Sequence, residues 1–310
     1  MNEHFALVIH GGAGTILKKN MTQEKEKQYE EKLLDALNAG YDILKNGGSS
    51  VECVEAVIRV MEDSPLFNAG KGSVFTSAGK NEMDASIMEG STLNAGSVAG
   101  VTRVKNPISA ARKVMEESPH VMLAGRGADA FAKNQGLEMA EPSYFYNEIR
   151  HRQWLKVKEA ESEDGGYNQP DSSEIEFNIN IEDDKQYGTV GAVALDRFGD
   201  IAAGTSTGGM TNKRWGRVGD SPIIAAGTYA DNKTCGVSCT GHGEYFIRAA
   251  VAYDVSARMK YMHVGVKEAA FQIIHGTLEE IGGKGGLIAL DAQGNLAMEF
   301  NTSGMYRGFV

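Results

Sequence analysis

The 310-residue sequence is short of basic charge and of long apolar runs, and each shortage excludes a class of function. Lysine and arginine together number 31 against 41 aspartates and glutamates, which leaves a net charge of −10. Nucleic acids and anionic membrane surfaces attract basic patches, so neither is an expected partner. No apolar run approaches the ~20 residues of a membrane helix, and the first residues lack the pattern of a secretion signal. We therefore expect a cytoplasmic protein whose partner is a small molecule or another protein.

Cysteine and proline are also scarce. The three cysteines, Cys53, Cys235 and Cys239, have neither a zinc-ligand nor a C-x-x-C spacing, which suits a reducing compartment. The histidines are scattered without metal-ligand spacing, and the glycine-rich stretch 10–14 matches neither phosphate-loop pattern. No cofactor is therefore expected for the chemistry. The sequence has 38 glycines but only 6 prolines, which indicates many sharp turns or close backbone approaches.

The first half of the chain predicts alternating strands and helices. An apolar strand over residues 5–9 enters a glycine loop at 10–14, and Ser49 with Glu52 forms a capping box that starts a second helix. Residues 64–77 break the periodicity and form a loop that carries glycines beside aromatics. Further helices are expected over 22–46 with Thr22 as N-cap, 107–115 with Asn106 as N-cap, and 126–134, and strands over 84–88 and 97–101.

A long acidic segment divides the chain. Residues 160–186 carry nine acidic side chains against Lys185 alone, and such a segment cannot offset its ordering entropy, so we expect it to be mobile. An inter-domain linker is the alternative. The apolar strand that starts abruptly at Thr189 argues against a linker.

Two similar hairpins predict the architecture of the second half. The stretches that begin at Gly191 and Gly286 align closely, and both are too apolar for a sheet with one solvated face. Helices are expected over 244–262 and 266–281. The pattern predicts an α+β fold, a four-layer αββα sandwich of two antiparallel sheets with helices outside.

Thr189 is a candidate nucleophile. A threonine hydroxyl needs a base beside it, and a threonine at a chain terminus can use its own α-amine. A self-cleaving precursor would provide that terminus, because Gly188 offers an unhindered carbonyl before Thr189. By position alone, a threonine that merely begins a strand is the favoured interpretation.

Polar residues beyond Thr189 change that balance. Thr207 ends the strand that pairs with the Thr189 strand, and Arg217 and Asp220 follow in a polar loop. Arg217 and Asp220 form either a simple salt bridge or a clamp for the α-carboxylate and α-ammonium of an amino acid. The stretch 239–244 opens a helix, whose free N–H groups favour a carboxylate or an oxyanion. His242 is favoured as a wall residue over a base, because no G-x-S-x-G accompanies it.

Several motifs together resemble one family. They are G-T-V-G-A-V-A-L-D, T-S-T-G-G-M-T-N-K, G-R-V-G-D-S-P and C-T-G-H-G-E, preceded by H-G-G-A-G, P-L-F-N-A-G-K-G and D-A-S-I-M-E-G and followed by N-T-S-G-M-Y-R-G. In this order, across nearly the whole chain, they resemble the plant-type (type III) asparaginases and isoaspartyl peptidases, which are N-terminal nucleophile (Ntn) hydrolases.

The resemblance implies self-cleavage between Gly188 and Thr189, with hydrolysis of L-asparagine and β-aspartyl dipeptides through a threonyl acyl-enzyme that releases L-aspartate. Residues 1–188, with an acidic tail from about 160, would form an α chain and residues 189–310 a β chain, together one αββα domain. By resemblance, Thr189 is nucleophile and base. The other implied site residues are Thr207 as support for the hydroxyl, Thr240 and the Gly241 N–H as the oxyanion hole, Arg217, Val218, Gly219, Asp220, His242 and Gly243 around the substrate, and Asn68 near the nucleophile.

Two further properties follow from the resemblance alone. Family members bind a structural sodium through main-chain carbonyls, here those of Met61, Glu62, Ser64, Phe67, Ala69 and Lys71. The family also implies a dimer of αβ heterodimers.

Three alternatives stay open. Glycosylasparaginases share the nucleophile and the clamp but are exported, and the missing signal argues against them. Threonine endopeptidases share the fold, but a clamp for a free amino acid end argues against them. A non-enzymatic protein could hold an amino acid with Arg217 and Asp220 while Thr189 stays inert. His242 departs from the threonine of some bacterial relatives, which leaves the preference between asparagine and isoaspartyl dipeptides open.

Overall fold

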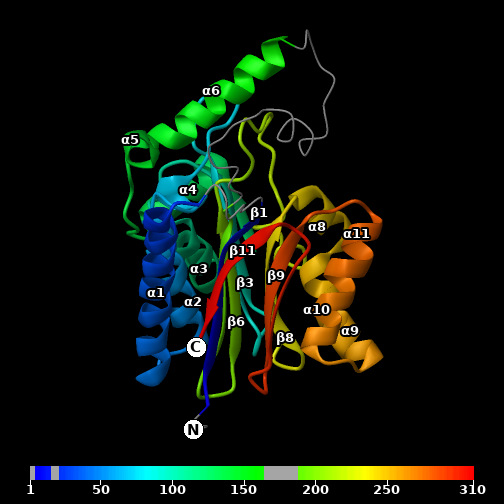
Figure 1. Ribbon diagram of the computed structural model, residues 1–310. Coiled ribbons are helices and arrows are strands. Elements are labelled where there is room, and N and C mark those ends of the chain that lie inside the picture. Colours follow the sequence, from blue (N-terminus) through cyan, green and yellow to red (C-terminus); the bar gives the residue numbers. More distant parts are fainter. Residues whose placement is uncertain (1–3, 15–20, 164–187) are drawn as a thin grey trace.

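The computed structural model describes residues 4–14, 21–163 and 188–310. Two β-sheets lie face to face in it, and helices lie on their outer faces (Figure 1). The predicted α+β class is confirmed. Within the described residues, no helix combines the length and apolar character needed to cross a membrane.

The larger sheet has seven strands and draws on both halves of the chain. Its order is β11-β1-β5-β6-β2-β3-β4, and every neighbouring pair is antiparallel except β3 and β4. The smaller sheet, in the order β10-β9-β8-β7, is antiparallel. The strands are β1 (Ala6–Gly14), β2 (Met83–Glu89), β3 (Ala95–Val101), β4 (Met122–Ala124), β5 (Val190–Leu195), β6 (Ile201–Thr207), β7 (Thr228–Ala230), β8 (Cys235–Gly241), β9 (Gly285–Asp291), β10 (Leu296–Phe300) and β11 (Gly304–Phe309).

Two groups of helices cover the sheets (Figure 1). Beside the larger sheet lie α1 (Gln23–Lys45), α2 (Ser50–Glu62), α3 (Pro107–Glu117) and α4 (Gly125–Asn134), followed by α5 (Pro142–Phe145) and α6 (Glu148–Glu163). Beside the smaller sheet lie α8 (Gly243–Ala249), α9 (Val251–Met262), α10 (Val266–Gln272), a π-helical turn (Ile273–Thr277) and α11 (Leu278–Glu280). The covered outer faces explain why both hairpins are apolar on both sides.

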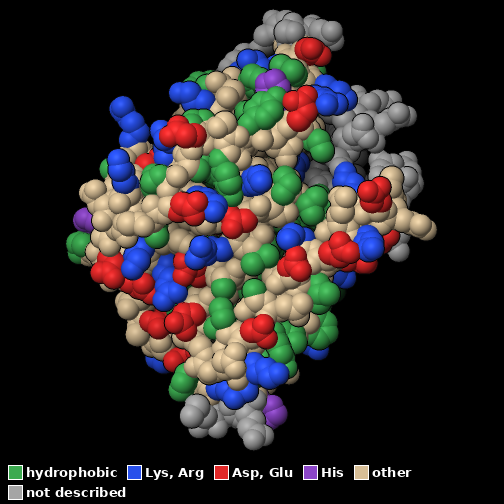
Figure 2. Space-filling view, turned by 90° about the vertical axis from the view of Figure 1, so that its left-hand side faces the viewer, with side chains coloured by type: hydrophobic (Ala, Val, Ile, Leu, Met, Phe, Trp, Pro, Cys, Tyr) green, Lys and Arg blue, Asp and Glu red, His purple; other side chains and the backbone are tan. Residues whose placement is uncertain are grey.

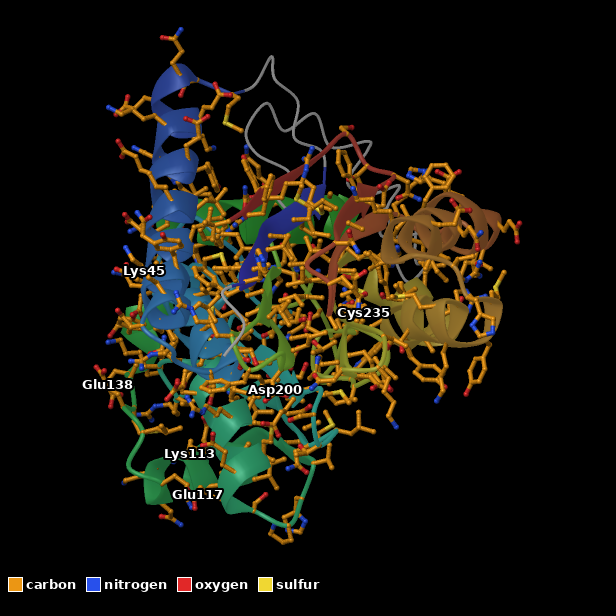
Figure 3. All side chains as sticks on the ribbon, turned by 90° about the horizontal axis from the view of Figure 1, so that it is seen from below. Lys45, Lys113, Glu117, Glu138, Asp200 and Cys235 are labelled. Atoms are coloured by element: carbon orange, nitrogen blue, oxygen red, sulfur yellow. The ribbon has the colours of Figure 1, made fainter. Side chains whose placement is uncertain are left out.

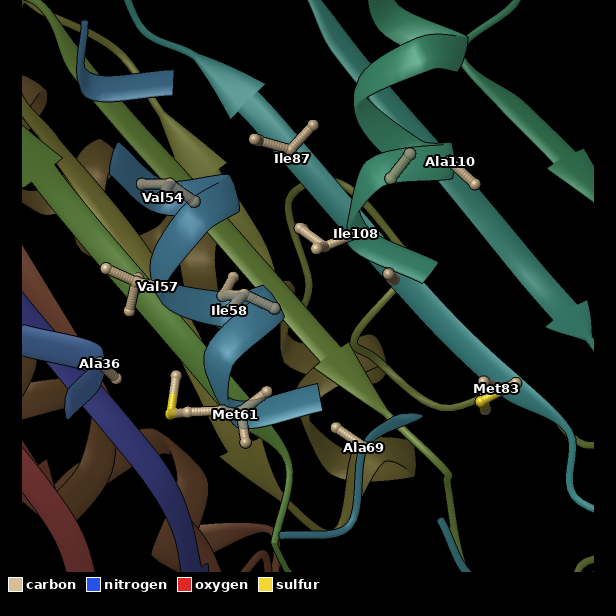
Figure 4. Close-up of a cluster of buried hydrophobic side chains, with 14 of the residues drawn as sticks. Ala36, Val54, Val57, Ile58, Met61, Ala69, Met83, Ile87, Ile108 and Ala110 are labelled. Carbon is tan, nitrogen blue, oxygen red and sulfur yellow. The ribbon is translucent and has the colours of Figure 1, made fainter. Parts of the chain in front are cut away.

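Alternation along each strand divides the core into layers. On β6, Ala202 packs into the helix-side core, and a Cβ on Gly204 would lie 2.7 Å from Val54 Cγ1 of α2. Ile201 and Ala203 point the other way, into the layer between the sheets. Figure 4 shows the helix-side cluster, in which Val54, Ile58 and Ile108 meet the face of the larger sheet.

Most charged side chains lie on the surface, whereas the thiols lie in the interior. Figure 2 shows acidic and basic side chains interspersed on the face formed by the helices beside the larger sheet, as a solvated face requires. Lys113 and Glu117 lie outside on α3, whereas Cys235 lies in the interior (Figure 3). All three cysteines are buried and unpaired.

Two of the predicted helix starts have the expected caps, and a third does not. Thr22 Oγ1 accepts from the Lys25 N–H, and Ser49 and Glu52 form the complete capping box. Asn106 donates to Asp63 instead of capping α3, and the N–H of Ile108 donates to Glu62 Oε1 at 3.0 Å. The sequence could not indicate this cap, because Glu62 is 46 residues away.

The prediction of a glycine loop at residues 10–14 is wrong, because strand β1 continues through these residues to Gly14. Strand β11 pairs with this stretch, with a bulge between His10 and Gly12. Glycine serves close packing here: a Cβ on Gly11 would lie 2.5 Å from the Phe67 ring, and Gly12 has a φ of +108°.

Two expected helices and the acidic segment also differ from their predictions. The helix expected over 244–262 is broken at Ala250, whose φ is +48°, because the N–H groups of Ala252 and Tyr253 donate to the loop carbonyls of Ala226 and Ala225. Helix α6 extends through Glu163, so the first residues of the acidic segment are helical, and Glu161 pairs with Arg214. The rest of that segment, residues 164–186, lies outside the described residues. The helix expected over 266–281 contains the π-helical turn.

Glu62 joins α2, α3 and β6 and generates a prediction about pH. Its Oε1 accepts from the Ile108 N–H and the Ser206 hydroxyl, and burial raises its pKa from 4.5 to about 8. The folded state therefore binds a proton that the unfolded state releases, and stability falls as pH rises from 4.5 to about 8. We expect Glu62→Gln, which stays neutral and keeps the acceptor oxygen, to show a smaller fall in Tm across this range. Thermal unfolding beside the exposed control Glu31→Gln checks this, and parallel curves for wild type and Glu62→Gln would contradict it.

Candidate active site

The layer between the two sheets changes from apolar to hydroxyl-bearing along its length. On β6 the residues that face this layer are Ile201 and Ala203, then Thr205 and Thr207. Strand β8 alternates in the same way: Val237 and Cys239 pack toward the helices beside the smaller sheet, which leaves Ser238 and Thr240 facing the larger sheet. A pocket opens at the hydroxyl-bearing end.

Most of the predicted site residues meet at this pocket. It encloses about 450 Å³ together with the open space at its mouth. Val218, Thr240 and Gly243 are absent from the lining. Thr240 lies just behind it, fully buried, where its Oγ1 accepts from the Ala13 N–H at 3.1 Å. The lining residues are Asn68, Gly188, Thr189, Thr207, Gly209, Met210, Arg217, Gly219, Asp220, Ser221, Gly241 and His242.

The hydroxyl of Thr189 lies against that of Thr207. Their Oγ1 atoms are 3.0 Å apart, and Thr207 Oγ1 also accepts from the Gly209 N–H at 3.0 Å. The pairing of β5 with β6 brings them together, because Val190 lies opposite Ser206 in that register. Hydrogen bonding fixes the Thr207 side chain, which in turn orients the Thr189 hydroxyl.

Asn68 holds the peptide that precedes Thr189. Its main-chain N–H donates to the carbonyl oxygen of Gly188 at 2.9 Å, and its own carbonyl accepts from the Gly208 N–H. Its side-chain amide bridges the Gly209 carbonyl at 2.7 Å and the Val74 N–H at 3.0 Å. The main chain of Asn68, rather than its amide, therefore contacts the Gly188–Thr189 segment.

Arg217 pairs with Glu244 rather than with Asp220 in the described part of the chain. Its Nε and Nη2 donate to the two carboxylate oxygens of Glu244, each at 2.8 Å. His242 Nε2 lies 3.3 Å from Glu244 Oε2. The sequence indicated only that Glu244 lies at the start of a helix, and it did not predict the contact between Glu244 and Arg217. The simple Arg217–Asp220 salt bridge is not observed.

Asp220 is a buried carboxyl whose Oδ2 has no hydrogen-bond partner among the described residues. Burial raises its pKa to about 6, and the nearby Arg217 guanidinium partly opposes that rise. An orphaned buried acceptor facing a pocket suits a cationic ligand group, because a bound cation would satisfy it.

Asp84 and Lys213 form a buried charged pair behind the pocket, which the sequence analysis did not predict. Lys213 Nζ is 3.7 Å from Asp84 Oδ2 and donates to the Glu82 carbonyl at 2.9 Å. Asp84 lies opposite Thr207 in the pairing of β2 with β6. The pair therefore fixes the turn that follows Thr207.

His10 also contacts the candidate nucleophile through the main chain. Its Nδ1 is 3.1 Å from the Thr189 carbonyl oxygen, and its Nε2 is 3.0 Å from Ser238 Oγ. Burial lowers the pKa of this imidazole to about 3. The only sequence signal was its place before the glycines.

No group of three or more His, Cys, Asp or Glu side chains that could hold a metal occurs in the described residues. The side chains at the pocket instead offer a nucleophile, a cation and a carboxylate. Such a set can add a hydroxyl to an acyl group of a ligand whose charged ends are held.

Comparison with known proteins agrees with this chemistry. The family model described as asparaginase matches residues 3–310. The chain is 47% identical to a putative isoaspartyl peptidase/L-asparaginase of Dictyostelium discoideum. The alignment covers 100% of this chain and 94% of that protein. It is 46% identical to an isoaspartyl peptidase of Escherichia coli, over 98% of this chain and 92% of that one. It is also 43% identical to a plant-type L-asparaginase of Pyrococcus furiosus, over 98% and 96%. The chain therefore belongs to the asparaginase family.

Proposed function

We propose that this protein is a threonine-type Ntn amidohydrolase that cleaves itself between Gly188 and Thr189 and then hydrolyses β-aspartyl dipeptides and L-asparagine. The observation that carries the proposal is the Thr189 hydroxyl, 3.0 Å from that of Thr207 at a pocket lined by Arg217 and Asp220. The names of its relatives, isoaspartyl peptidase and plant-type L-asparaginase, support the substrate class.

Self-cleavage would begin at the Gly188 carbonyl. The Thr189 oxygen adds to the carbonyl carbon, the carbon–nitrogen bond breaks, and the residue 189 nitrogen leaves as a free amine. Water then hydrolyses the resulting ester, which gives a carboxylate at Gly188 and restores the Thr189 hydroxyl. The Asn68 N–H on the Gly188 oxygen supports this step, because it already holds that carbonyl in place.

Turnover would use the new terminus. The freed amine accepts the hydroxyl proton while Thr189 Oγ1 attacks the β-aspartyl carbonyl, and ammonia or the peptide amine departs. Water then releases L-aspartate from the acyl-enzyme. Thr240 and the Gly241 N–H would stabilise the oxyanion, and the hydroxyl proton of Thr240 is available because its oxygen accepts from Ala13.

The charged residues would fix the orientation of the substrate. Glu244 holds the Nε and Nη2 edge of Arg217, so the Nη1 side is left for the substrate α-carboxylate. Gly219 leaves room there, since a Cβ at this position would lie 2.8 Å from Nη1. The orphaned oxygen of Asp220 would accept the α-ammonium.

The two fragments would stay together as one domain after cleavage. Strand β5 of residues 189–310 pairs with β1 of residues 1–188, and β6 pairs with β2. Fragments that share a sheet in this way are held by its hydrogen bonds and core. We assign the arrangement to the four-layer αββα sandwich of Ntn hydrolases, made of an α chain and a β chain.

The turn around Gly70 is a proposed sodium site. Cβ atoms on Gly70 and Gly72 would lie 2.4 Å from the Glu62 carbonyl oxygen and 2.0 Å from that of Phe67, so both oxygens point into the turn. Carbonyl oxygens suit a hard cation. We propose that such carbonyls hold a structural sodium. The dimer of αβ heterodimers and the cytoplasmic location stay predictions.

Thr189→Ala tests the nucleophile. We expect purified wild type to separate into two fragments, the smaller beginning at Thr189, and to release ammonia from asparagine. Thr189→Ala should remain one chain of 33.3 kDa without turnover, because it lacks the attacking oxygen. Thr189→Ser keeps that oxygen and should still be processed. Intact mass and ammonia release measure both properties, and processing of Thr189→Ala would identify a different nucleophile.

Asp220→Asn tests the clamp through pH. With its pKa near 6, Asp220 becomes neutral below that pH, so kcat/KM should fall as pH decreases through about 6. Asp220→Asn should lack this inflection and raise KM by about 10- to 100-fold, the worth of one charge-assisted hydrogen bond. Initial rates with a β-aspartyl dipeptide over a pH series measure this. The exposed control Asp35→Asn should match wild type, and an unchanged profile in Asp220→Asn would remove Asp220 from substrate binding.

A further inference from the structure

A continuous chain of polar side chains crosses the layer between the two sheets. It is made of His10 and four hydroxyl residues and is called here the hydroxyl chain. Each oxygen or nitrogen lies within hydrogen-bond distance of the next: His10 Nε2 to Ser238 Oγ at 3.0 Å, Ser238 Oγ to Thr205 Oγ1 at 2.7 Å, Thr205 Oγ1 to Thr228 Oγ1 at 2.6 Å, and Thr228 Oγ1 to Ser86 Oγ at 2.8 Å.

The two ends of the hydroxyl chain reach the two halves of the proposed active site. At one end His10 Nδ1 contacts the carbonyl oxygen of Thr189, the nucleophile, at 3.1 Å. At the other end the single hydroxyl proton of Ser86 is shared between Thr228 Oγ1 and the carbonyl oxygen of Ser221, which lies 2.6 Å from Ser86 Oγ, one residue after Asp220. The hydroxyl chain therefore connects the nucleophile to the loop that would bind the substrate ammonium.

The geometry fixes the state of His10. A carbonyl oxygen only accepts, so Nδ1 carries the proton and donates to Thr189. Nε2 then accepts from the Ser238 hydroxyl. Burial favours this neutral imidazole, since it lowers the pKa of His10 to about 3.

Burying so many polar groups is costly unless each is paired. All five side chains are fully buried, and each would cost about 1–3 kcal/mol if left without a partner. The neighbouring part of the same layer is filled by apolar side chains such as Val193, Ile201 and Ile288. An apolar filling is therefore compatible with the fold, and stability alone does not require the hydroxyl chain.

Gly191 makes room for this arrangement. A Cβ at this position would lie 2.0 Å from Ser238 Oγ and 2.3 Å from His10 Nε2. The residue two places after the nucleophile is thus limited to glycine by the contact between His10 and Ser238.

We propose that His10 is a positioning residue for Thr189 and that the hydroxyl chain sets the distance between the nucleophile and the Asp220 loop. The proposal rests on the function proposed above. Self-cleavage turns Thr189 into a chain terminus, and termini move freely unless they are tied down. His10 holds the carbonyl of this terminus, and Thr207 holds its hydroxyl. Together they fix the residue after its bond to Gly188 has been cut.

Thr205 is the position at which the test is sharpest, because it lies in the middle of the hydroxyl chain. Thr205→Val keeps the shape and removes the hydroxyl, whereas Thr205→Ser keeps the hydroxyl. We expect Thr205→Val to lower kcat for a β-aspartyl dipeptide by about 10- to 100-fold, as a displaced reacting group does, and Thr205→Ser to retain most of it. Ser256→Ala is the matched control, since its hydroxyl forms a buried pair of the same kind with Thr234 at 2.6 Å, outside the hydroxyl chain.

Substitutions at the two ends of the hydroxyl chain should change different kinetic constants. Ser238→Ala removes the donor to His10, so it should lower kcat with KM changed less than about twofold. Ser86→Ala releases the Ser221 carbonyl, so it should chiefly raise KM. A role in stability alone would lower Tm and leave this division of kcat and KM absent.

The outcomes separate the two proposals. Wild type without turnover would overturn the proposed function and this assignment with it. An active wild type in which Thr205→Val and Ser238→Ala keep the kcat of Ser256→Ala would overturn the hydroxyl chain alone. A loss in Thr205→Val with recovery in Thr205→Ser supports it. Should Thr205→Val fail to fold, Ser238→Ala and Ser86→Ala decide by the same division of kcat and KM.

Discussion

The packing of the two sheets against each other is the contact on which the rest of the structure depends. Apolar side chains such as Val193, Ile201 and Ile288 fill one part of the layer and supply the burial that holds the sheets together. Toward the pocket the same strands present Thr205, Thr207 and other hydroxyls. One packed layer thus contains both a core and the approach to an active site, and its rigidity fixes the distances between reactive groups.

Charge at the pocket is held in place before any ligand arrives. Glu244 grips Arg217 through two hydrogen bonds, and Lys213 lies beside Asp84 behind the turn that follows Thr207. Asp220 is the exception, since its Oδ2 lacks a hydrogen-bond partner among the described residues. This unpaired buried oxygen favours a ligand that carries a positively charged group next to Asp220.

Interleaved strands make cleavage compatible with a stable fold. Strand β5 lies between β1 and β6, so the segment that starts at residue 190 is bonded along its length to the first strand of the chain. Cutting the peptide before Thr189 would remove one covalent bond but none of these pairings. The carbonyl contact of His10 and the hydroxyl contact of Thr207 would then define the new terminus.

The sequence by itself determined the local elements and the local part of the site. Helical periodicity and caps located α1 and α2, and strand alternation with a short turn brought Thr207 back beside Thr189. Family motifs indicated Arg217 and Asp220. These features depend on residues close together in the chain, which a sequence pattern can detect.

The predictions that failed have the opposite cause. The strand at residues 10–14 exists because β11 pairs with it, the α3 cap comes from Glu62, and the break at Ala250 follows from bonds to a distant loop. His10 is 179 residues from Thr189, and Ser238 is 228 from His10. Only the tertiary structure decided these contacts, because they arise when two sheets pack, and no local pattern encodes which side chains then meet.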